Sequence, residues 1–456
     1  MPPRQSSPMS IIRWSRSKSG AISTDQAWQV HIFPMKILMI GSGGREHAIL
    51  WKLTQSPRVT ELLCAPGNAG TAELATNHPV AASDLPGLLA LAKSEHVDLT
   101  LVGPDDPLAA GIVDLFQKEG LRVFGPLAAA ARLESSKSFA KEFMIRHGIP
   151  TAGSATFSDP EAALAHCATS IYPLVVKADG LALGKGVVIA QTQGEAETAI
   201  REIMIDKVFG DAGDTVVIEE FLTGPECSLH ALIDGKNYLL FPDAKDHKRA
   251  LEGDQGLNTG GMGTISPSGV VDVTMRERLK LEVLEPFVQG LQVDNLPFQG
   301  MLFPGLMMTP SGPKVLEFNC RFGDPETQSL MRRLKSDLLD LIEATIDGRL
   351  SETTPVWDER AAVCIVLASG GYPGPIEKGK LITGLEVASA DADIVVFHAG
   401  TALKEEDGNG LVVTNGGRVL GITALGTTLE EARRKAYAAA DKIAFEGKQL
   451  RRDIGA

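Results

Sequence analysis

Short apolar runs that alternate with glycine-rich turns and helical patterns dominate residues 35–126. The run Lys36–Ile40 ends in Gly41-Ser42-Gly43-Gly44, and a helical pattern follows over Arg45–Gln55. Three further runs end in loops that contain Gly or Pro: Glu61–Ala65, Leu99–Val102 and Arg122–Phe124. Strands that alternate with helices form parallel sheets, because each helix carries the chain back to start the next strand. The pattern therefore predicts a doubly wound parallel sheet that binds its ligand at the carboxyl ends of the strands.

The pattern changes to mixed α+β after about residue 136. A helix is expected over Ser138–His147 and a longer one over Gln328–Asp347. Strands are expected at Leu174–Lys177, Val187–Ala190, Val216–Phe221, Ser228–Ile233, Met301–Met308 and Lys314–Asn319. The polar stretch Lys245–Gly263 shows almost no strand or helix pattern, which is typical of a functional or disordered loop. A small final α/β unit begins at Ala361–Ala368 and ends in a helix over Leu429–Ala444.

A chain of 456 residues is too long for a single core, so several domains are expected. We predict an extension over 1–34, an N-terminal α/β domain over 35–136, a central domain over 137–355 and a C-terminal domain over 356–456. The extension is basic and rich in serine. It resembles a transit peptide, a cloning remnant or a misread start, and Met35 directly before the first strand favours the last two.

Composition excludes several classes of partner. The net charge of −13 argues against nucleic acid, whose phosphates require a basic face. No apolar run approaches the ~20 residues of a membrane helix. The five cysteines form no CxxC pair, which favours a reducing compartment and a cytoplasmic protein.

The first glycine loop is close to a dinucleotide fingerprint but departs from it. Glu46 stands where the third glycine would permit close packing of helix and strand, so a nicotinamide cofactor is disfavoured. A tight turn and a phosphate site at the helix start both remain open.

A second glycine loop follows the strand that ends at Lys177. It contains Gly184-Lys185-Gly186, which departs from the Walker pattern because Gly186 replaces Ser or Thr. The loop could close over a triphosphate while Lys177 pairs with its oxygens. The alternative is an exposed hairpin with solvated lysines.

Acidic residues recur at two later strand ends. Glu219, Glu220 and Glu226 surround a strand end that could hold adenine and ribose, although such acids are often only solvated. Glu317 and Asn319 share one face of a strand because side chains alternate with period two. Their oxygens suit Mg²⁺, and Arg321 could reach the same face to stabilise a transferring phosphoryl group.

Two segments of the long polar stretch have two interpretations each. Asp246-His247-Lys248-Arg249 is either a clamp on anions or a solvated charge run. Asn258-Thr259-Gly260-Gly261-Met262-Gly263 is either backbone shaped around a ligand or a linker. Five further histidines show no metal-ligand spacing and are expected to be structural or on the surface: His31, His78, His96, His166 and His398.

Six motifs in order carry a resemblance to a known family: GSGGREH (41–47), PGNAG (66–70), KADGLALGKGV (177–187), DHKR (246–249), NTGGMG (258–263) and EFNCRFGDPETQ (317–328). Together they resemble the ATP-grasp superfamily and, within it, the phosphoribosylamine–glycine ligase family. The resemblance implies a central two-lobed ATP-grasp domain. It also implies that ATP drives the joining of glycine to 5-phosphoribosylamine through glycyl phosphate, in a monomer that uses Mg²⁺ or Mn²⁺.

The resemblance implies roles for individual residues. For ATP these are Lys137, Lys177, Gly184, Lys185, Gly186, Glu219, Glu220, Leu222 and Glu226. For the metal they are Glu317 and Asn319. For the substrates they are Gly43, Gly44, Asn68, Gly70, Asp105, Asp246, Lys248 and Arg249, with Arg321, Asp324 and Lys177 catalytic.

Some positions depart from the family pattern. Asp105 stands where a glutamate is expected, and Ser136 replaces a glycine before Lys137. The alternatives are another ATP-grasp carboxylate–amine ligase, a carboxylase of purine metabolism, or a nucleotide-binding protein without activity.

Overall fold

The computed structural model describes residues 34–181, 186–406 and 409–456. The predicted extension and the predicted ATP-loop residues Gly184 and Lys185 therefore lie outside the described residues. No helix in the described ranges is long and apolar enough to cross a membrane.

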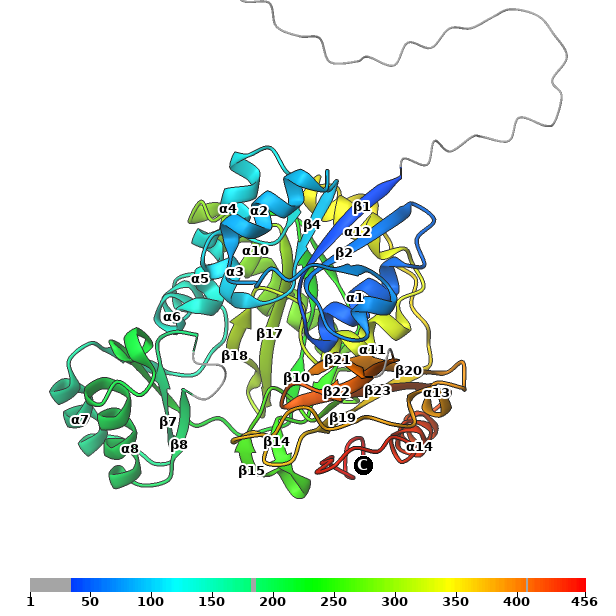
Figure 1. Cartoon of the computed structure of the whole chain (residues 1–456). Coiled ribbons are helices and arrows are strands. Elements are labelled where there is room, and N and C mark those ends of the chain that lie inside the picture. The colour runs from blue at the N-terminus through cyan, green and yellow to red at the C-terminus, as the bar shows by residue number, and fades with distance from the viewer. Residues whose placement is uncertain (1–33, 182–185, 407–408) are drawn as a thin grey trace, which may run out of the picture. The chain divides into compact units, whose positions relative to one another are not determined.

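The first sheet has five parallel strands in the order β3-β2-β1-β4-β5 (Figure 1). Its strands are β1 Met35–Gly41, β2 Val59–Pro66, β3 Thr76–Asn77, β4 Leu99–Val102 and β5 Val123–Phe124. Its helices are α1 Gly44–Leu53, α2 Leu85–Ser94, α3 Asp105–Ala109 and α4 Ile112–Lys118. The predicted parallel sheet is confirmed. Only the two-residue edge strand β3 was not predicted, because it is too short to show a pattern.

Side chains of β1 alternate between two apolar clusters, as a doubly wound sheet requires. Ile37 and Met39 pack in one cluster with α1, and Leu38 and Ile40 pack in another with α2 and α4. Both faces of the strand are buried, which explains its continuous apolar run.

A small antiparallel lobe has the order β6-β9-β7-β8 and a core of its own. It consists of β6 Ser154–Phe157, α7 Pro160–Thr169, β7 Leu174–Ala178, β8 Val187–Ala190, α8 Gln193–Ile200 and β9 Val216–Glu220. Helices α5 Ala128–Ser135 and α6 Lys137–Arg146 lead into it. Figure 1 shows the lobe in teal and green.

The second central sheet is antiparallel and is built around β17 and β18. Its elements are β10 Glu226–Ser228, β11 Ala231–Ile233, β12 Tyr238–Leu240, α9 Val273–Leu279, α10 Glu285–Val293, β17 Gly300–Thr309 and β18 Gly312–Asn319. The single strand predicted over Ser228–Ile233 is wrong. The chain forms β10 and β11, which pair with different parts of β17.

A third sheet has the order β13-β16-β19-β23-β20. Its strands are β13 Lys245–Asp246, β16 Gly263–Ser266, β19 Ala361–Ala368, β20 Ile394–His398 and β23 Arg418–Gly426. Around it lie β14 Arg249–Leu251, β15 Gln255–Asn258, α13 Leu385–Ala388, β21 Thr401–Glu406, β22 Asn409–Thr414 and α14 Leu429–Ala440. The polar stretch 245–263 is therefore not structureless: β13 pairs with β16, which pairs with β19, and β14 pairs with β15.

The long helix predicted after the Glu317 strand is also wrong in one respect. Two helices are present, α11 Glu326–Arg333 and α12 Leu338–Ile346. Leu334 is extended, and the Asp337 carboxylate accepts a hydrogen bond from the Leu339 N–H and so begins α12. Aspartate is a favoured residue at a helix start, and this cap was the missed signal.

Candidate functional site

The first glycine loop is organised around the buried carboxylate of Glu46. Its Oε2 accepts a hydrogen bond from the Gly43 N–H at 2.6 Å, and its Oε1 pairs with Arg45 Nε at 2.6 Å. A Cβ at Gly103 would lie 2.0 Å from Glu46 Oε1, and one at Gly41 would lie 2.6 Å from its Cγ. The glycines make room for Glu46, so a tight turn explains this part of the loop.

A cavity of about 310 Å³ opens beside this loop. The lining residues from the first sheet are Ser42, Gly43, Gly67 and Asn68. The lining residues from later in the chain are Asp324, Tyr372, Ala399, Gly400, Thr401, Asn415, Gly416 and Arg418. Segments some 300 residues apart in sequence therefore form one cavity.

The four substrate residues predicted in the N-terminal α/β domain before Asp105 fall into two groups. Gly43 and Asn68 line the cavity. Gly44 instead packs against Gln328, where a Cβ would lie 2.5 Å from Nε2. Gly70 packs against His47 and His398, which would lie 2.4 Å and 2.6 Å from its Cβ.

The Asn68 side chain has a structural role beside this cavity. Its Nδ2 donates to the carbonyl oxygens of Ser42 and His398, each at 2.9 Å. Its Oδ1 accepts hydrogen bonds from the N–H groups of Gly70 and Thr71. The amide thus ties the first glycine loop to the end of β20 and leaves little capacity for a ligand.

Arg418 supplies the cavity with a positive charge that the sequence analysis missed. Its Nη2 lies 3.4 Å from Asp324 Oδ2, and its Nη1 donates to the Asp324 carbonyl at 2.7 Å. Burial raises the pKa of Asp324, but Arg418 and Arg45 outweigh burial and hold it below its usual value. The glycine-rich turn Asn415–Arg418 was the available signal.

A buried triad of charges lies where α6, β7 and β9 meet. Glu219 pairs through Oε2 with Lys177 Nζ at 2.9 Å and through Oε1 with Lys141 Nζ at 3.2 Å. Lys177 also donates to the Leu316 carbonyl at 3.2 Å, directly before Glu317. The pKa of Lys141 is lowered to about 8 by burial, against the opposing effect of Glu219. Lys141 was not predicted, because its partner is 78 residues away in sequence.

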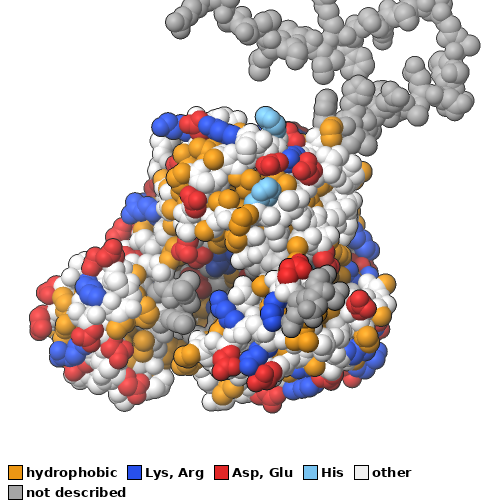
Figure 2. Space-filling view, viewed as in Figure 1, with side chains coloured by type: hydrophobic (Ala, Val, Ile, Leu, Met, Phe, Trp, Pro, Cys, Tyr) orange, Lys and Arg blue, Asp and Glu red, His pale blue; other side chains and the backbone are white. Residues whose placement is uncertain are grey.

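The other residues predicted for ATP lie near this triad. Lys137 Nζ donates to the Gly180 carbonyl at 2.9 Å, and the Gly186 carbonyl accepts from the Ala178 N–H. Glu220 pairs with Lys314 at 2.7 Å, and the Leu222 side chain is buried. The face of the protein beside the small lobe is hollowed, with Lys or Arg side chains at the hollow (Figure 2).

Glu317 and Asn319 end β18, as the period-two argument requires. Asn319 is held at both ends: its Nδ2 donates to the Phe303 carbonyl at 3.2 Å, and its Oδ1 accepts from Arg321 Nη2 at 3.1 Å. Burial raises the pKa of Glu317, but nearby cations, chiefly Lys248 and Lys177, outweigh burial and lower it. Glu317 is therefore an ionised carboxylate at neutral pH.

These two oxygen donors fit a divalent cation that is shared with phosphates. No group of three or more His, Cys, Asp or Glu in the described ranges could hold a metal by itself. Mg²⁺ is usually held by one or two carboxylates together with phosphate oxygens and waters, so a pair of hard donors is sufficient.

Arg321 is fixed by the buried carboxylate of Glu134, which the sequence analysis also missed. Arg321 Nη2 lies 3.1 Å from Glu134 Oε1, and Glu134 Oε2 accepts from the Cys320 N–H at 2.6 Å. Burial raises the pKa of Glu134 to about 7, although Arg321 opposes it. Asp105 lies close enough to raise this pKa further. Asp105 thus belongs to the surroundings of Arg321 and is not among the residues that line the 310 Å³ cavity.

The two basic residues of the motif over 246–249 lie in different surroundings. Lys248 Nζ lies 3.3 Å from Glu226 Oε2 and 4.0 Å from Glu317 Oε1, so it joins the predicted ribose and metal ligands. Arg249 instead donates to the Gly256 carbonyl at 2.8 Å within the β14–β15 hairpin. Asp246 lies close to both Lys248 and Glu326.

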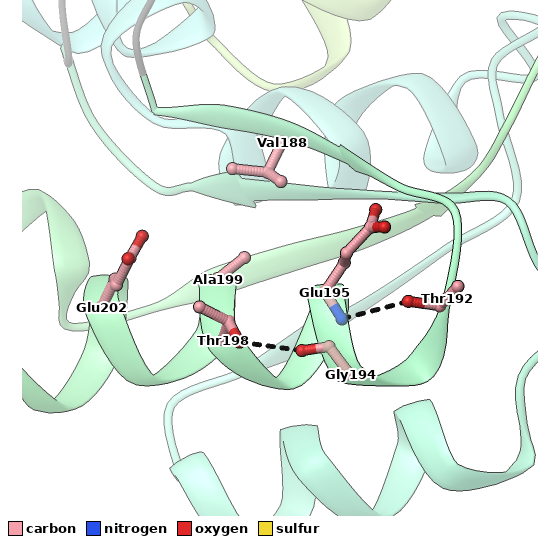
Figure 3. A pocket seen from close by; sticks show the side chains of 7 residues that line it. All are labelled: Val188, Thr192, Gly194, Glu195, Thr198, Ala199 and Glu202. Carbon is pink, nitrogen blue, oxygen red and sulfur yellow. Dashed lines mark hydrogen bonds between the residues drawn. The ribbon is translucent and has the colours of Figure 1, made fainter.

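A second hollow, of about 450 Å³, lies between β8 and α8 on the small lobe (Figure 3). The Thr192 hydroxyl accepts a hydrogen bond from the Glu195 N–H, and the Thr198 hydroxyl donates one to the Gly194 carbonyl. Both hydroxyls are therefore hydrogen-bonded to the backbone of α8. Glu195 and Glu202 are its charged lining residues, and no cation lines it. This hollow does not suit a triphosphate.

Comparisons with known proteins agree on one family. The phosphoribosylglycinamide synthetase models match the N domain over residues 35–134, the ATP-grasp (A) domain over 135–327 and the C domain over 362–456. The chain is 53% identical over 424 residues to a phosphoribosylamine–glycine ligase of Xanthomonas campestris pv. campestris, covering 92% of this chain and 97% of the relative. It is 50% identical over 424 residues to that of Yersinia pestis, covering 92% and 98%. The crystal structure of a phosphoribosylamine–glycine ligase from Thermotoga maritima superposes with a TM-score of 0.80 at 36% identity, covering 92% of this chain and all of the other.

Proposed function

This chain belongs to the phosphoribosylglycinamide synthetase family, and we propose that it joins glycine to 5-phosphoribosylamine in purine biosynthesis, using ATP. The products are glycinamide ribonucleotide, ADP and phosphate. The observation that carries the proposal is the convergence of Lys177, Glu317 and Arg321 within a few residues of one strand end.

In the first step, a glycine carboxylate oxygen attacks the γ-phosphorus of ATP, and the bond from that phosphorus to the bridging oxygen breaks. A carboxylate is a poor acyl donor, and phosphorylation supplies the leaving group it lacks. The step brings several anions together, so positioning and neutralisation of charge account for most of the catalysis.

The site residues divide these tasks. Lys177 and Lys137 would bind phosphate oxygens, and Glu226 would accept hydrogen bonds from the ribose hydroxyls. Glu317 and Asn319 would hold a divalent metal, which neutralises charge on the phosphates when bound. Magnesium or manganese would serve. Arg321 would lie against the transferring phosphoryl group, where Glu134 keeps its guanidinium in place.

In the second step, the nitrogen of phosphoribosylamine attacks the carbonyl carbon of glycyl phosphate. The bond from carbon to the phosphate oxygen breaks, phosphate leaves, and the amine nitrogen loses a proton. The 310 Å³ cavity is suited to the phosphoribosyl group, because glycine backbone borders it and Arg418 contributes a cation. Asp324 links this cavity to the Arg321 loop.

We further propose a monomer as the active form. All five cysteines are free and buried, which supports a reducing compartment such as the cytoplasm.

The proposal is tested by release of ADP when single components are omitted. We expect release to require glycine and a divalent metal together, and ligated product to require phosphoribosylamine as well. Release that depends on bicarbonate and is indifferent to glycine would instead identify a carboxylase.

A further inference from the structure

The carboxylate of Asp179 connects the loop after β7 to the first turn of α6. Asp179 follows β7 directly, because that strand ends at Ala178. Its Oδ1 accepts a hydrogen bond from the Ser138 N–H at 3.0 Å, and its Oδ2 accepts one from the Ser138 hydroxyl at 2.5 Å. One carboxylate thus receives two hydrogen bonds from a residue 41 positions earlier in the chain.

The start of α6 is held by acceptors on two sides. Ser136 precedes the helix, and its hydroxyl accepts from the Phe139 N–H at 3.2 Å. Asp179 accepts from the Ser138 N–H. The first N–H groups of a helix have no partner within the helix and carry partial positive charge, so a hydroxyl and a carboxylate both stabilise this end. Lys137 lies between the two serines, and its backbone is therefore held on both sides.

The loop side of this contact is fixed as well. The Asp179 N–H donates to the Thr215 carbonyl at 3.0 Å. A Cβ at Gly180 would lie 2.5 Å from Ala212 Cβ, so the loop backbone packs directly against the segment before β9. In the opposite direction, Lys137 Nζ donates to the Gly180 carbonyl at 2.9 Å. Two contacts in opposite directions therefore join α6 to the end of β7.

Charge pairing does not account for this arrangement. Among the described residues, Asp179 and Lys137 form no ion pair with each other or with any other residue. Asp179 directs its charge at the backbone of α6, and Lys137 donates to a neutral carbonyl. The carboxylate that fixes the helix thus leaves the ammonium charge of Lys137 unneutralised, and such a lysine is suited to phosphate oxygens.

We propose that Asp179 is a positioning residue for the nucleotide, which sets Lys137 of α6 beside Lys177 of β7 so that both lysines reach one triphosphate. This inference rests on the proposed function, in which both lysines bind phosphate oxygens. Asp179 lies two residues after Lys177 and is hydrogen-bonded to the residue that follows Lys137. The bond from Lys137 to Gly180 cannot replace this contact, since it passes through a flexible side chain rather than through the backbone of α6.

The effect of Asp179 belongs to the binding of ATP. Lys137 and Lys177 come from different elements, and without a fixed spacing they would have to be ordered when ATP binds, at a cost in binding free energy. The 310 Å³ cavity proposed for the phosphoribosyl group is lined instead by residues of the first sheet and by residues from Asp324 onward. Binding of phosphoribosylamine should therefore not depend on Asp179.

The test measures the KM for ATP and the KM for phosphoribosylamine, each with the other components saturating. Asp179→Ala removes both acceptor oxygens. We expect the KM for ATP to rise about 10-fold and the KM for phosphoribosylamine to change by less than about twofold, as loss of two hydrogen bonds to a charged group near the lysines alone implies.

Two milder variants separate positioning from a loss of folding. Ser138→Ala keeps the hydrogen bond from the Ser138 N–H and removes the one from the hydroxyl, and Asp179→Asn keeps one acceptor oxygen. Each should raise the KM for ATP by about threefold, because one of the two hydrogen bonds remains. These variants decide the case if Asp179→Ala does not fold.

Asp159→Ala is the matched control, because Asp159 also begins a helix of the small lobe. Its carboxylate accepts from the Glu161 N–H at 3.2 Å at the start of α7. The variant should have a lower melting temperature, as loss of a helix cap implies, and unchanged KM values for both substrates.

An unchanged KM for ATP in folded Asp179→Ala, or an equal rise in both KM values, would overturn the inference and leave the ligase function intact. An equal rise in the KM for ATP in Asp159→Ala would overturn it as well. A wild-type protein that releases ADP without glycine would instead overturn the proposed function, and the response of the KM for ATP to Asp179→Ala could still be measured.

Discussion

Glu219 neutralises two buried lysines at once, so its carboxylate has both a structural and a functional effect. Lys141 and Lys177 are 4% and 8% exposed in their side chains, and Glu219 is 3% exposed. Removal of one member of a buried ion pair typically costs about 3–5 kcal/mol, because it leaves an uncompensated charge.

We therefore expect Glu219→Gln to lower the free energy of unfolding by about 3 kcal/mol. The adjacent Glu220 provides a matched control, because its pair with Lys314 is half exposed. Glu220→Gln should change stability by less than about 1 kcal/mol. Urea denaturation of both variants measures the difference, and equal losses would show that Glu219 is not the shared counterion.

At Glu317 the expected effect is on turnover. Glu317→Gln should reduce kcat by about 100-fold or more, as loss of electrostatic stabilisation implies. Its melting temperature should stay near that of the wild type, because the Glu317 side chain is 40% exposed.

The Glu317→Gln variant should also need more Mg²⁺ to reach half-maximal rate. Glu282→Gln, which removes an exposed helical pair with Arg278, is the control for a lost surface charge. A Glu317 variant that unfolds would point to a structural strand end.

The roles of residues were predictable where they depend on the spacing of residues close together in the sequence. Glu317 and Asn319 are two positions apart in a strand, so they share a face whatever the tertiary structure. Lys141, Glu134 and Arg418 were missed because their partners lie 78, 187 and 94 residues away. No local pattern marks such contacts.

Among the elements, α1 and β20 meet at a pair of buried histidines. His47 Nδ1 accepts a hydrogen bond from the His398 N–H at 2.8 Å. Burial, with help from His398, lowers the pKa of His47 to about 3, and burial lowers that of His398 to about 4. Both rings are neutral in the folded protein at neutral pH.

The contact between these two histidines predicts that the free energy of unfolding falls in acid. Because the pKa values are lower in the folded state than the ordinary 6.5, the unfolded chain binds more protons between about pH 4 and 6.5. Stability is therefore complete above 6.5 and falls as the pH drops through that window. Each histidine should contribute about 1 kcal/mol of loss between pH 7 and 5.5.

Urea unfolding of His398→Gln at those two pH values provides the measurement. The variant should lose less stability on acidification than the wild type does. Identical pH dependence would show that the histidine pair does not control the acid response.

Most elements were predictable because their apolar periodicity is local. β4 and β8 were placed at their observed bounds, and four of the five strands of the parallel sheet followed from alternation alone. The stretch 245–263 was not predictable, because β16 is ordered by pairing with β19 of the C-terminal part and β13 by pairing with β16. Four residues of β16 pair with β19, nearly 100 positions later.

For the whole molecule, this pairing joins the central and C-terminal parts of the chain. Residues 34–355 and 356–456, expressed separately, should each be poorly soluble, because β16 and β19 would expose unpaired edges. Expressed together, they should copurify and recover ADP release. Two fragments that are each stable and monomeric alone would contradict this expectation.

The shared sheet also limits how such chains can recombine. A chimera that exchanged only residues 356–456 with a relative would pair β19 of one parent with β16 of the other. The mismatch would fall beside Asp246, Gly261 and Arg418. Chimeras that fold should therefore exchange residues 245–266 together with the C-terminal part. Strands that pair with each other then come from the same parent, although they lie far apart along the chain.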